Sequence, residues 1–440
     1  MHMKLLILTP QRVEALGCQL AEILLMREPI AIKPFWVSIV ALFAMAALLS
    51  ARADDAAHLV PSPGLIPPSF FGMHIHHGGK ETPWPAPPVA AWRLWDASVG
   101  WPQIEPRPKQ WHFELLDRYL SLAKEHNTEV LLPLGLSPQW ASVRPLEKSV
   151  YQPGSAAQPK EMQDWRDYVT TVVAHCKGRV GAYEIWNEPN EKGFWTGDTP
   201  TLLALTREAS EIIHSIDPEA YVVSPAPTTN SGVEWLVAFL RGGGGHYVDV
   251  IGYHFYVAPQ TPEAMVPLSQ KVRQVMADTG VGDKPLWNTE SGWAQPKPFP
   301  SEELAAAYLS RAYILNWAAN IRRFYWYAWD NHSWVSLETT KMDNKTLTPA
   351  GRAYGIVQRW LVGAEMNGCD EDANQTWTCQ LTRHGAQEWI IWNVAGTRAF
   401  TVPEAWHADG VTPLLGEHRA FAGSDFEIGP VPELVTGSVR

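Results

Sequence analysis

Two glutamates stand at the ends of short apolar runs in this chain. Glu188 lies in the run Tyr183–Asn190, which ends in Asn-Glu-Pro-Asn, and Glu290 closes the run Pro285–Glu290. Pro189 has no N–H to continue a ladder, so Glu188 should project from the C-terminal end of its strand. Glycoside hydrolysis needs one carboxylic acid to protonate the leaving oxygen and one carboxylate to attack or to activate water. The two glutamates therefore predict sugar chemistry.

Short apolar runs alternate with helical patterns along most of the chain. The runs cover residues 70–76, 91–96, 129–134, 180–187, 220–225, 248–256, 285–290 and 323–329. Helical periodicity predicts helices over 113–125, 163–176, 201–216, 233–240, 262–278 and 302–319. This alternation predicts an α/β fold, a (β/α)8 TIM barrel, whose active site lies at the C-terminal ends of the strands. Glu188 would end the fourth strand and Glu290 the seventh.

The pattern changes after about residue 355. Residues 377–383, 388–394 and 397–402 have the composition of short strands joined by turns. We therefore expect the barrel over residues 69–355 and a small antiparallel, β-sandwich-like domain over 356–440. The proline-rich segment 54–68 would either link to the barrel or add a strand to the β domain.

Residues 1–53 have the features of an upstream segment followed by a signal peptide. Arg27 and Lys33 precede an apolar run over 35–49, and residues 51–53 form an Ala-x-Ala cleavage site. Met26 is then the expected true start. Because the apolar run is short for a membrane span, we expect an exported protein, periplasmic or secreted. An uncleaved N-terminal anchor is the alternative.

Charge and cysteine content exclude some classes of function. The formal net charge is −11 and there is no basic stripe, which argues against nucleic acid as a partner. No Cys-x-x-Cys pair or Cys/His cluster at zinc spacing occurs in the sequence, so we expect no metal and no other cofactor. Cys369 and Cys379 bracket a hairpin-like stretch and could form a disulfide in an oxidising compartment. The sequence leaves that pairing and the oligomeric state open.

Together these motifs resemble glycoside hydrolase clan A, in which the acid/base follows the fourth strand within Asn-Glu-Pro and the nucleophile follows the seventh. The closer resemblance is to family 39 and its exopolysaccharide-hydrolase (Psl-type) relatives. It rests on the motifs Trp186–Asn190, Arg93–Asp96 and Gly252–Tyr256 and on the β domain. The resemblance implies a retaining double displacement, with Glu290 as nucleophile and Glu188 as acid/base.

Several polar side chains near the strand ends are candidates for supporting roles. The resemblance implies that Asn187 hydrogen-bonds the sugar 2-hydroxyl. Arg93 could hold Glu290 ionised, or it could form an ion pair with Glu184 inside the barrel. Tyr256 could hydrogen-bond Glu290.

Histidines and tryptophans give further candidates. His254 ends the sixth strand and His74 and His76 end the first, and each is a sugar ligand or a core group. Trp329, at the end of the eighth strand, is the expected floor of the subsite for the cleaved sugar. The other candidate platforms, weighed against packing roles, are Trp140, Trp195 and Trp293.

The prediction is thus a retaining glycosidase that cleaves a polysaccharide or oligosaccharide, with an endo mode on an exopolysaccharide favoured. One alternative is an exo-acting enzyme of the β-xylosidase or iduronidase type. Another is a catalytically silent carbohydrate-binding barrel, against which the presence of both glutamates argues. Transfer to a sugar hydroxyl instead of water also remains open.

Overall fold

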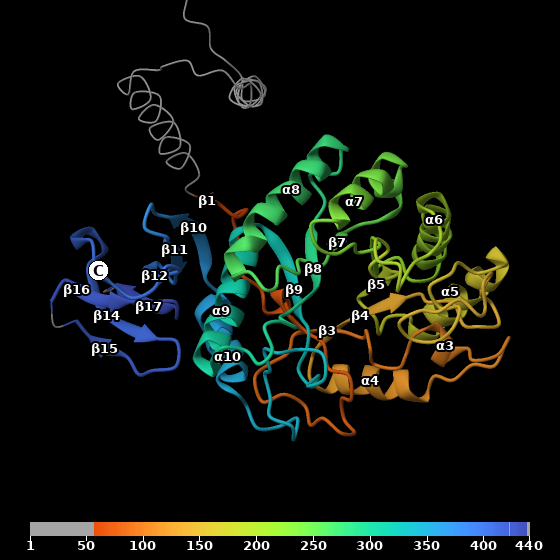
Figure 1. Ribbon diagram of the computed structural model, residues 1–440, viewed down its shortest axis with the longest axis horizontal. Coiled ribbons are helices and arrows are strands. Elements are labelled where there is room, and N and C mark those ends of the chain that lie inside the picture. Colours follow the sequence, from red (N-terminus) through yellow and green to blue (C-terminus); the bar gives the residue numbers. More distant parts are fainter. Residues whose placement is uncertain (1–56, 422, 438–440) are drawn as a thin grey trace, which may run out of the picture. The chain divides into compact units, whose positions relative to one another are not determined.

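The computed structural model describes residues 57–421 and 423–437. They form two main parts (Figure 1). One is a parallel eight-stranded sheet surrounded by helices, and the other is an antiparallel sheet built mainly from the C-terminal residues. The predicted signal peptide and the preferred start at Met26 lie outside the described residues. Within the described part of the chain, no helix has the length and apolar character needed to cross a membrane.

The parallel strands form the barrel that the sequence predicts. They are β2 (Phe71–Met73), β3 (Ala91–Arg93), β4 (Glu129–Leu134), β5 (Ala182–Ile185), β6 (Tyr221–Val223), β7 (Ile251–Tyr253), β8 (Leu286–Ser291) and β9 (Ile321–Trp326). Their order in the sheet is β6-β5-β4-β3-β2-β9-β8-β7. Isolated bridges, Val223 with Val250 and Thr228 with His254, connect the two outer strands of this order. Every predicted barrel strand is confirmed.

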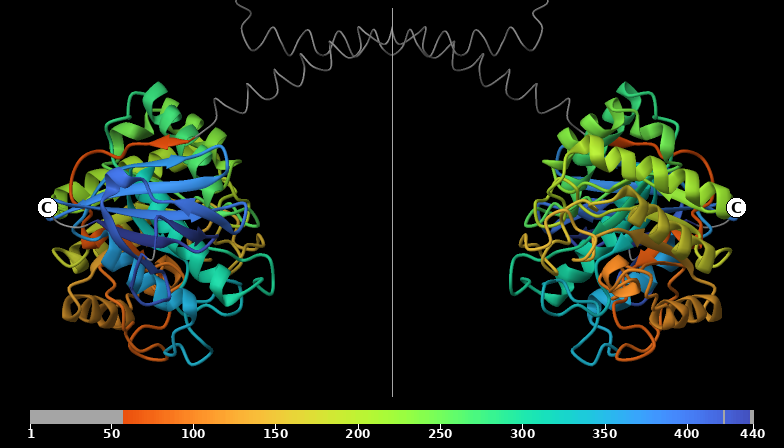
Figure 2. Two further views of the ribbon diagram at one scale, coloured as in Figure 1. Left: turned by 90° about the vertical axis from the view of Figure 1, so that its left-hand side faces the viewer. Right: turned by 90° about the vertical axis from the view of Figure 1, so that its right-hand side faces the viewer.

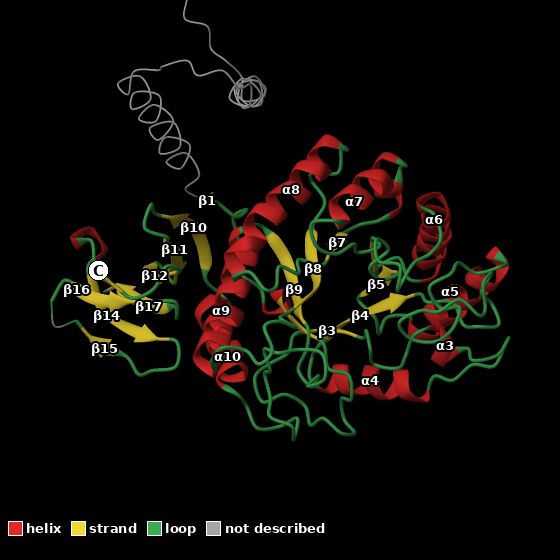
Figure 3. Cartoon of the chain, in the orientation of Figure 1, coloured by secondary structure: helices red, strands yellow, loops and turns green. Residues whose placement is uncertain are grey.

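Helices cover the outside of the barrel (Figure 3). They are α3 (Trp101–Ile104), α4 (Glu114–Glu125), α5 (Met162–Cys176), α6 (Thr199–Ile216), α7 (Gly232–Arg241), α8 (Met265–Asp278), α9 (Glu302–Ala318) and α10 (Pro349–Leu361), with short 3-10 turns η1 (Pro68–Phe70), η2 (Gly244–Tyr247) and η3 (Pro262–Ala264). Side-chain caps begin three of them: Asp198 for α6, Ser301 for α9 and Thr348 for α10 each accept a backbone N–H of the first turn. Helix α9 is buried on nearly all sides because it packs against α10, β9 and β10.

The antiparallel sheet has the order β1-β10-β11-β12-β17-β14-β15, and β13 pairs with β16 beside it (Figure 2). The strands are β1 (His58–Leu59), β10 (Glu365–Glu371), β11 (Thr376–Arg383), β12 (Ala386–Asn393), β13 (Arg398–Thr401), β14 (Ala408–Pro413), β15 (Arg419–Ala420), β16 (Asp425–Ile428) and β17 (Glu433–Gly437), and the turn η4 (Glu404–Trp406) follows β13. A disulfide between Cys369 and Cys379 joins β10 to β11.

Two details of the β domain refine the sequence analysis. Segment 54–68 contributes strand β1, which pairs with β10, so it adds a strand to this sheet. The change of pattern expected near residue 355 falls inside α10, and the strands of the sheet begin at Glu365. The sequence analysis predicts no helix there, because the amphipathic pattern of α10 straddles the expected boundary.

Inside the barrel, an apolar layer lies below a charged one. Ala91, Leu131, Ala182, Val223, Val250, Trp287 and Tyr325 form one buried cluster. Two residues further along β3 and β5 come Arg93 and Glu184, which therefore point to the same interior one layer higher. This layer lies next to the C-terminal ends of the strands, where the candidate catalytic groups are found.

Candidate active site

Glu188 and Glu290 come together at the C-terminal ends of two barrel strands that are not adjacent in the sheet. Glu188 follows β5, and Glu290 is the last residue but one of β8. One carboxylate oxygen of each residue lies within 4.8 Å of the other. Retaining glycosidases separate their carboxyl groups by roughly 5–5.5 Å, whereas inverting enzymes leave roughly 6.5–9.5 Å for a water molecule. The spacing fits direct attack by one of the two carboxylates.

Glu290 accepts hydrogen bonds at both oxygens. Arg93 Nη1 donates to Oε2 at 2.6 Å, and the Tyr256 hydroxyl donates to Oε1 at 3.0 Å. The Arg93 side chain is fully buried and that of Glu290 is 9% exposed. A buried cation and a hydroxyl donor both favour the carboxylate over the carboxylic acid.

Arg93 does more than bind Glu290. Its Nε donates to Glu184 Oε2 at 2.7 Å, and its Nη2 donates to Asn187 Oδ1 at 2.8 Å. The two roles that the sequence offered for Arg93 are therefore both realised by one guanidinium. The same contact orients Asn187, whose Nδ2 is buried and has no hydrogen-bond partner within the described residues.

His74 completes the surroundings of Arg93. Burial lowers the pKa of His74 well below its ordinary value, and the Arg93 charge acts in the same direction. The ring is therefore neutral. Its Nδ1 lies 3.1 Å from the Trp326 carbonyl oxygen and its Nε2 lies 3.1 Å from Arg93 Nη1. A proton on Nδ1 satisfies both contacts, because Nδ1–H donates to the carbonyl and Nε2 accepts from Arg93.

Glu188 has a less polar environment than Glu290. Its Oε1 lies 2.9 Å from Nδ1 of His254. Burial lowers the pKa of His254 to about 4, so that this ring is neutral at physiological pH. Burial also raises the pKa of Glu188 to about 7. A carboxyl group of this kind can hold a proton at neutral pH.

Burial likewise raises the pKa of Glu290 to about 7, so burial does not distinguish the two carboxyls. Their contacts do. Arg93 touches Glu290 directly, whereas the group that touches Glu188 is a neutral imidazole. Glu290 is therefore the first of the pair to ionise, and its charge then opposes ionisation of Glu188. When the pair holds one proton, these contacts favour its residence on Glu188.

The two glutamates open into a cavity of about 820 Å³. Its lining includes four carboxyl groups, those of Asp96, Glu188, Glu191 and Glu290, and none of the described residues that line it is Lys or Arg. Aromatic rings form much of the remaining wall, and they are Trp95, Tyr151, Phe194, Tyr256, Tyr327 and Trp334. The cavity thus combines carboxylates with apolar ring faces, the combination that carbohydrate recognition uses.

Comparison with known proteins agrees with this geometry. Residues 102–330, more than half of the chain, match the sequence profile of glycosyl hydrolases family 39. The chain belongs to glycosyl hydrolases family 39. A β-xylosidase of Geobacillus stearothermophilus is 27% identical over 225 residues, which are 45% of this chain and 44% of that protein. The chain thus matches less than half the length of this relative.

Solved structures of family 39 share the fold. A family 39 glycoside hydrolase from Bacteroides cellulosilyticus superposes with a TM-score of 0.68 at 16% identity, covering 84% of this chain and 81% of that one. A family 39 β-xylosidase from Caulobacter crescentus superposes with a TM-score of 0.61 at 16% identity, covering 88% and 98%. These matches extend over both the barrel and the β domain.

In this family 39 barrel, the polar residues predicted to surround the glutamates lie beside them, whereas most aromatic residues of the cavity wall are not the predicted ones. Arg93, Asn187, His254 and Tyr256 all lie beside the glutamates, as described above. Tyr256 lines the cavity, and Arg93, Asn187 and His254 are buried beside the two glutamates. His254 thus contacts Glu188 directly, and its role as a sugar ligand stays a prediction.

His76 does not line the cavity either. Its ring is 5% exposed, lies 5.2 Å from the Tyr327 ring, and has Nδ1 3.9 Å from Asp330. Asp330 accepts hydrogen bonds from the backbone N–H groups of His76 and His77, which fixes the loop after β2. These contacts favour the core role for His76, while its Nε2 is buried without a partner among the described residues and its role as a sugar ligand stays a prediction.

The tryptophans predicted as sugar platforms are buried. Trp293 is 0% exposed, stacks on Trp326 with ring centroids 5.7 Å apart and donates its Nε1–H to the Gln260 carbonyl. Trp329 is 1% exposed and Trp195 is 2% exposed. Trp140 is partly buried and donates to the Glu105 carbonyl. None of the four is among the residues that line the catalytic cavity, so the structure favours a packing role for them, and their role as sugar platforms stays a prediction.

The aromatic residue that β9 delivers to the cavity is Tyr327, the first residue after the strand. The apolar run predicts a strand that continues to residue 329, past the observed end of β9 at Trp326. The strand end was therefore expected at Trp329. Tyr151 and Trp334 were also missed, because they lie in long loops without periodicity. Both side chains are more than one third exposed, and a sequence pattern in a loop does not show which side chains are exposed.

Asp96 binds two of the aromatic residues of the cavity wall, Tyr151 and Tyr327. It accepts hydrogen bonds from the hydroxyls of Tyr151 and, at 2.6 Å, Tyr327. Tyr151 comes from the loop after β4 and Tyr327 follows β9, so Asp96 joins distant parts of the chain at the cavity wall. The motif Arg93–Asp96 contained this residue, but nothing in the sequence assigned it a role.

Glu188, His254 and Glu290 also offer ligand atoms within 4.8 Å of one another, a spacing that a metal ion could use. A metal cation there would lie beside the guanidinium that already neutralises Glu290, and the two positive charges would repel. The donor set therefore suits proton transfer better than metal binding. That the protein uses no metal remains a prediction.

Proposed function

We propose that the protein is a retaining glycosidase that cleaves internal bonds of a neutral polysaccharide or oligosaccharide. The observation that carries this proposal is the carboxyl pair, whose nearest oxygens lie within 4.8 Å, with Arg93 bound to one partner and a neutral histidine to the other. This asymmetry gives the two carboxyls different protonation states at one pH, as double displacement requires.

The reaction follows from that asymmetry. Glu290 attacks the anomeric carbon while Glu188 transfers its proton to the glycosidic oxygen, and the aglycone leaves. This step forms a glycosyl–enzyme ester on Glu290. Glu188, now ionised, takes a proton from a water molecule that attacks the anomeric carbon, and Glu290 departs as a carboxylate. Asn187, with Oδ1 held by Arg93, has Nδ2 free to donate to the sugar 2-hydroxyl.

The charge of the cavity supports a neutral sugar. Four carboxyl groups line it, and no Lys or Arg is among the described lining residues. A uronic acid at the cleaved position would bring a further negative charge without a cationic partner, which is costly in a partly buried site. The cavity therefore argues against the iduronidase-like alternative.

Neighbouring cavities support the endo mode. A cavity of about 330 Å³ shares Trp95, Asp96 and Tyr151 with the catalytic one. Another, of about 580 Å³, shares Ala294, Gln295 and Trp334 with it. The catalytic cavity thus adjoins further space both at Tyr151 and at Trp334, and we infer that this space holds sugar units beyond the cleaved bond. An exopolysaccharide is the substrate class we propose, on the strength of the sequence resemblance and of export through the N-terminal signal.

An exo-acting β-xylosidase is the second candidate. The relative from Geobacillus stearothermophilus carries that name. The observation that favours this candidate is the hydrogen bond between Tyr151 and Asp96, which joins the loop after β4 to the loop after β3 at the wall of the catalytic cavity.

Product analysis tests the proposal. Wild type and the variant Glu290→Gln are incubated with a panel of neutral polysaccharides, and with 4-nitrophenyl β-xyloside, β-glucoside and β-glucuronide. We expect oligosaccharides from wild type, none from the variant, and weaker turnover of the glucuronide than of the glucoside. Release of single sugars alone would favour the exo candidate. Longer products than the starting chains would indicate transfer, and binding without turnover by wild type would establish the silent barrel.

A further inference from the structure

Trp334 is an exposed ring at the edge of the catalytic cavity. It is 46% exposed, yet it has a defined packing partner on each of two strand ends. Its ring meets Tyr256 edge-on at 5.6 Å between centroids and Tyr327 at 5.3 Å. Both tyrosines line the cavity, and Tyr256 binds Glu290. The indole therefore continues the aromatic wall outward from the nucleophile.

The loop that carries Trp334 is fixed to the catalytic cavity by hydrogen bonds. Asn331 Oδ1 accepts from the Trp334 backbone N–H at 2.9 Å, and Asn331 Nδ2 donates to the Tyr327 hydroxyl oxygen at 3.1 Å. That hydroxyl in turn donates to Asp96. The ring is thus held in place before any ligand binds, which lowers the entropy cost of binding.

A groove runs from the catalytic cavity past Trp334. The cavity of about 580 Å³ described above includes Lys297, and Lys297 also lines a third cavity of about 380 Å³. Lys297 Nζ donates to the Ser333 carbonyl at 2.6 Å, so the loop after β8 and the loop after β9 form the two sides of one groove. The three cavities thus lie next to one another along the loops after β8 and β9.

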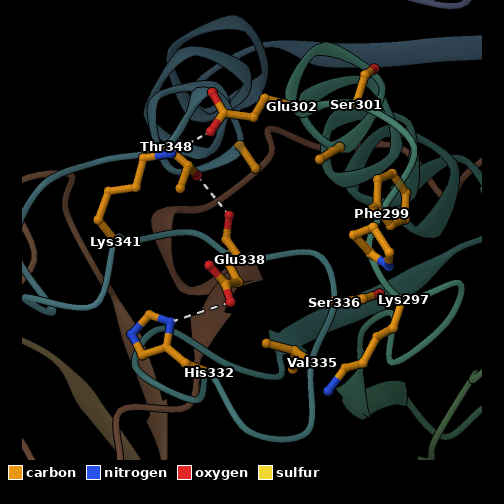
Figure 4. A pocket seen from close by; sticks show the side chains of 13 residues that line it. Lys297, Phe299, Ser301, Glu302, His332, Val335, Ser336, Glu338, Lys341 and Thr348 are labelled. Atoms are coloured by element: carbon orange, nitrogen blue, oxygen red, sulfur yellow. Dashed lines mark hydrogen bonds and ion pairs between the residues drawn. The ribbon is translucent and has the colours of Figure 1, made fainter.

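The far end of the groove suits a hydroxyl-rich ligand (Figure 4). Figure 4 shows Lys297 and His332 at one end of the third cavity and Ser301 and Glu302 at the other, with Glu338 between them. These side chains include both hydrogen-bond donors and acceptors, as sugar hydroxyls require. Phe299 adds an apolar face.

We propose that Trp334 is the stacking platform of a distal sugar subsite, and that the groove from Glu290 past Trp334 toward Lys297 binds further sugar units of the substrate chain. This inference rests on the proposed glycosidase function and names the part of the protein that recognises chain length. The occupant is the substrate itself, because the cavity past Trp334 shares Ala294, Gln295 and Trp334 with the catalytic cavity. The exposed indole face supplies the apolar surface on which a pyranose ring can stack.

The test compares ligands of increasing length in two assays. The variants are Trp334→Ala, Trp334→Phe and the control Tyr221→Ala. Tyr221 is a suitable control because it is 49% exposed and begins β6, at the opposite end of the barrel from the active site. Kinetics use 4-nitrophenyl β-xyloside and β-1,4-xylo-oligosaccharides of two to six sugars. Binding of the same oligosaccharides is measured by calorimetry in the Glu290→Gln background, which needs no turnover.

We expect Trp334→Ala to weaken binding of the longer oligosaccharides by about tenfold and to lower kcat/KM for them by a similar factor. The value of kcat/KM for the aryl xyloside should change by less than twofold. Trp334→Phe should recover most of the loss, and Tyr221→Ala should behave as wild type. Equal losses for short and long ligands, or no loss, would overturn the proposal. So would wild-type affinity that does not rise with chain length. Failure of the proposed function is a separate result: no aryl glycoside is hydrolysed by wild type.

Discussion

Arg93 Nη1 lies 2.6 Å from Oε2 of Glu290, and this contact divides the roles of the two glutamates. Both carboxyls are buried, so burial alone raises both pKa values. A fully buried cation bound to one of them makes that one ionise first and leaves the proton on the other. The chemistry we propose depends on this difference, and the first predictions address it.

Glu290→Gln should lower kcat by at least about 10⁴-fold, because an amide cannot form the glycosyl–enzyme ester. The change keeps the size of the side chain, so the melting temperature should stay near that of wild type. Steady-state kinetics with an aryl glycoside and thermal unfolding check both points. Glu303→Gln, a change at an exposed position in the first turn of α9, is the matched control. Turnover by Glu290→Gln within tenfold of wild type would contradict the nucleophile assignment.

Glu188→Ala should reduce cleavage of substrates with poor leaving groups by about 10²–10⁴-fold, because those leaving oxygens must be protonated. Formation of the glycosyl–enzyme from an activated aryl glycoside should be much less affected. Pre-steady-state release of the aryl group measures that step directly. Added azide should accelerate the second step, since it needs no base, and should yield a glycosyl azide. Equal losses on both substrate types would count against the acid role.

The wild-type pH profile of kcat/KM should be bell-shaped, with activity lost as pH rises through about 7. Burial raises the pKa of Glu188 to about 7, so above that pH the acid loses the proton that it must donate. The limb at low pH reports protonation of Glu290. In Glu188→Ala acting on an activated aryl glycoside, the basic limb should disappear while the acid limb stays. Retention of the basic limb in that variant would assign it to another group.

Arg93→Met should move the acid limb to higher pH by about one pH unit. The guanidinium stabilises the Glu290 carboxylate, so its removal raises the pKa of Glu290, and protonation inactivates the nucleophile at a higher pH. The loss of a partner for Glu184 and Glu290 should also destabilise the fold by about 3–5 kcal/mol. Arg93→Lys keeps the charge and should recover part of both effects. An unchanged acid limb in a folded Arg93→Met protein would show that Arg93 does not control Glu290.

The disulfide between Cys369 and Cys379 should contribute about 2–3 kcal/mol to the stability of the β domain, because it closes a short loop between β10 and β11. The double variant Cys369→Ala/Cys379→Ala should therefore melt at a lower temperature than oxidised wild type. A reducing agent should lower the melting temperature of wild type and leave that of the double variant unchanged. An equal response of both proteins to the reductant would contradict this contribution.

The sequence by itself determined the barrel, its strand order along the chain and the strand ends that carry Glu188 and Glu290. It could do so because these features are local: an apolar run of strand length, an amphipathic helix and a proline that ends a strand each depend on neighbouring residues. The alternation of the two elements then limits the fold to few topologies. Arg93 was a candidate through the motif Arg93–Asp96, and the sequence left open whether its partner was Glu290 or Glu184.

The lining of the cavity was decided by the tertiary structure. Trp293, Trp329 and Trp334 all lie in the loops after β8 and β9, yet packing buries the first two and leaves the third exposed. Asp96 acquires its role from Tyr151 and Tyr327, which belong to distant loops. Which face of a ring meets solvent depends on what other segments pack against it, and those contacts are non-local. A sequence pattern carries no record of them, and the three-dimensional arrangement of the loops therefore settles where a sugar chain can lie.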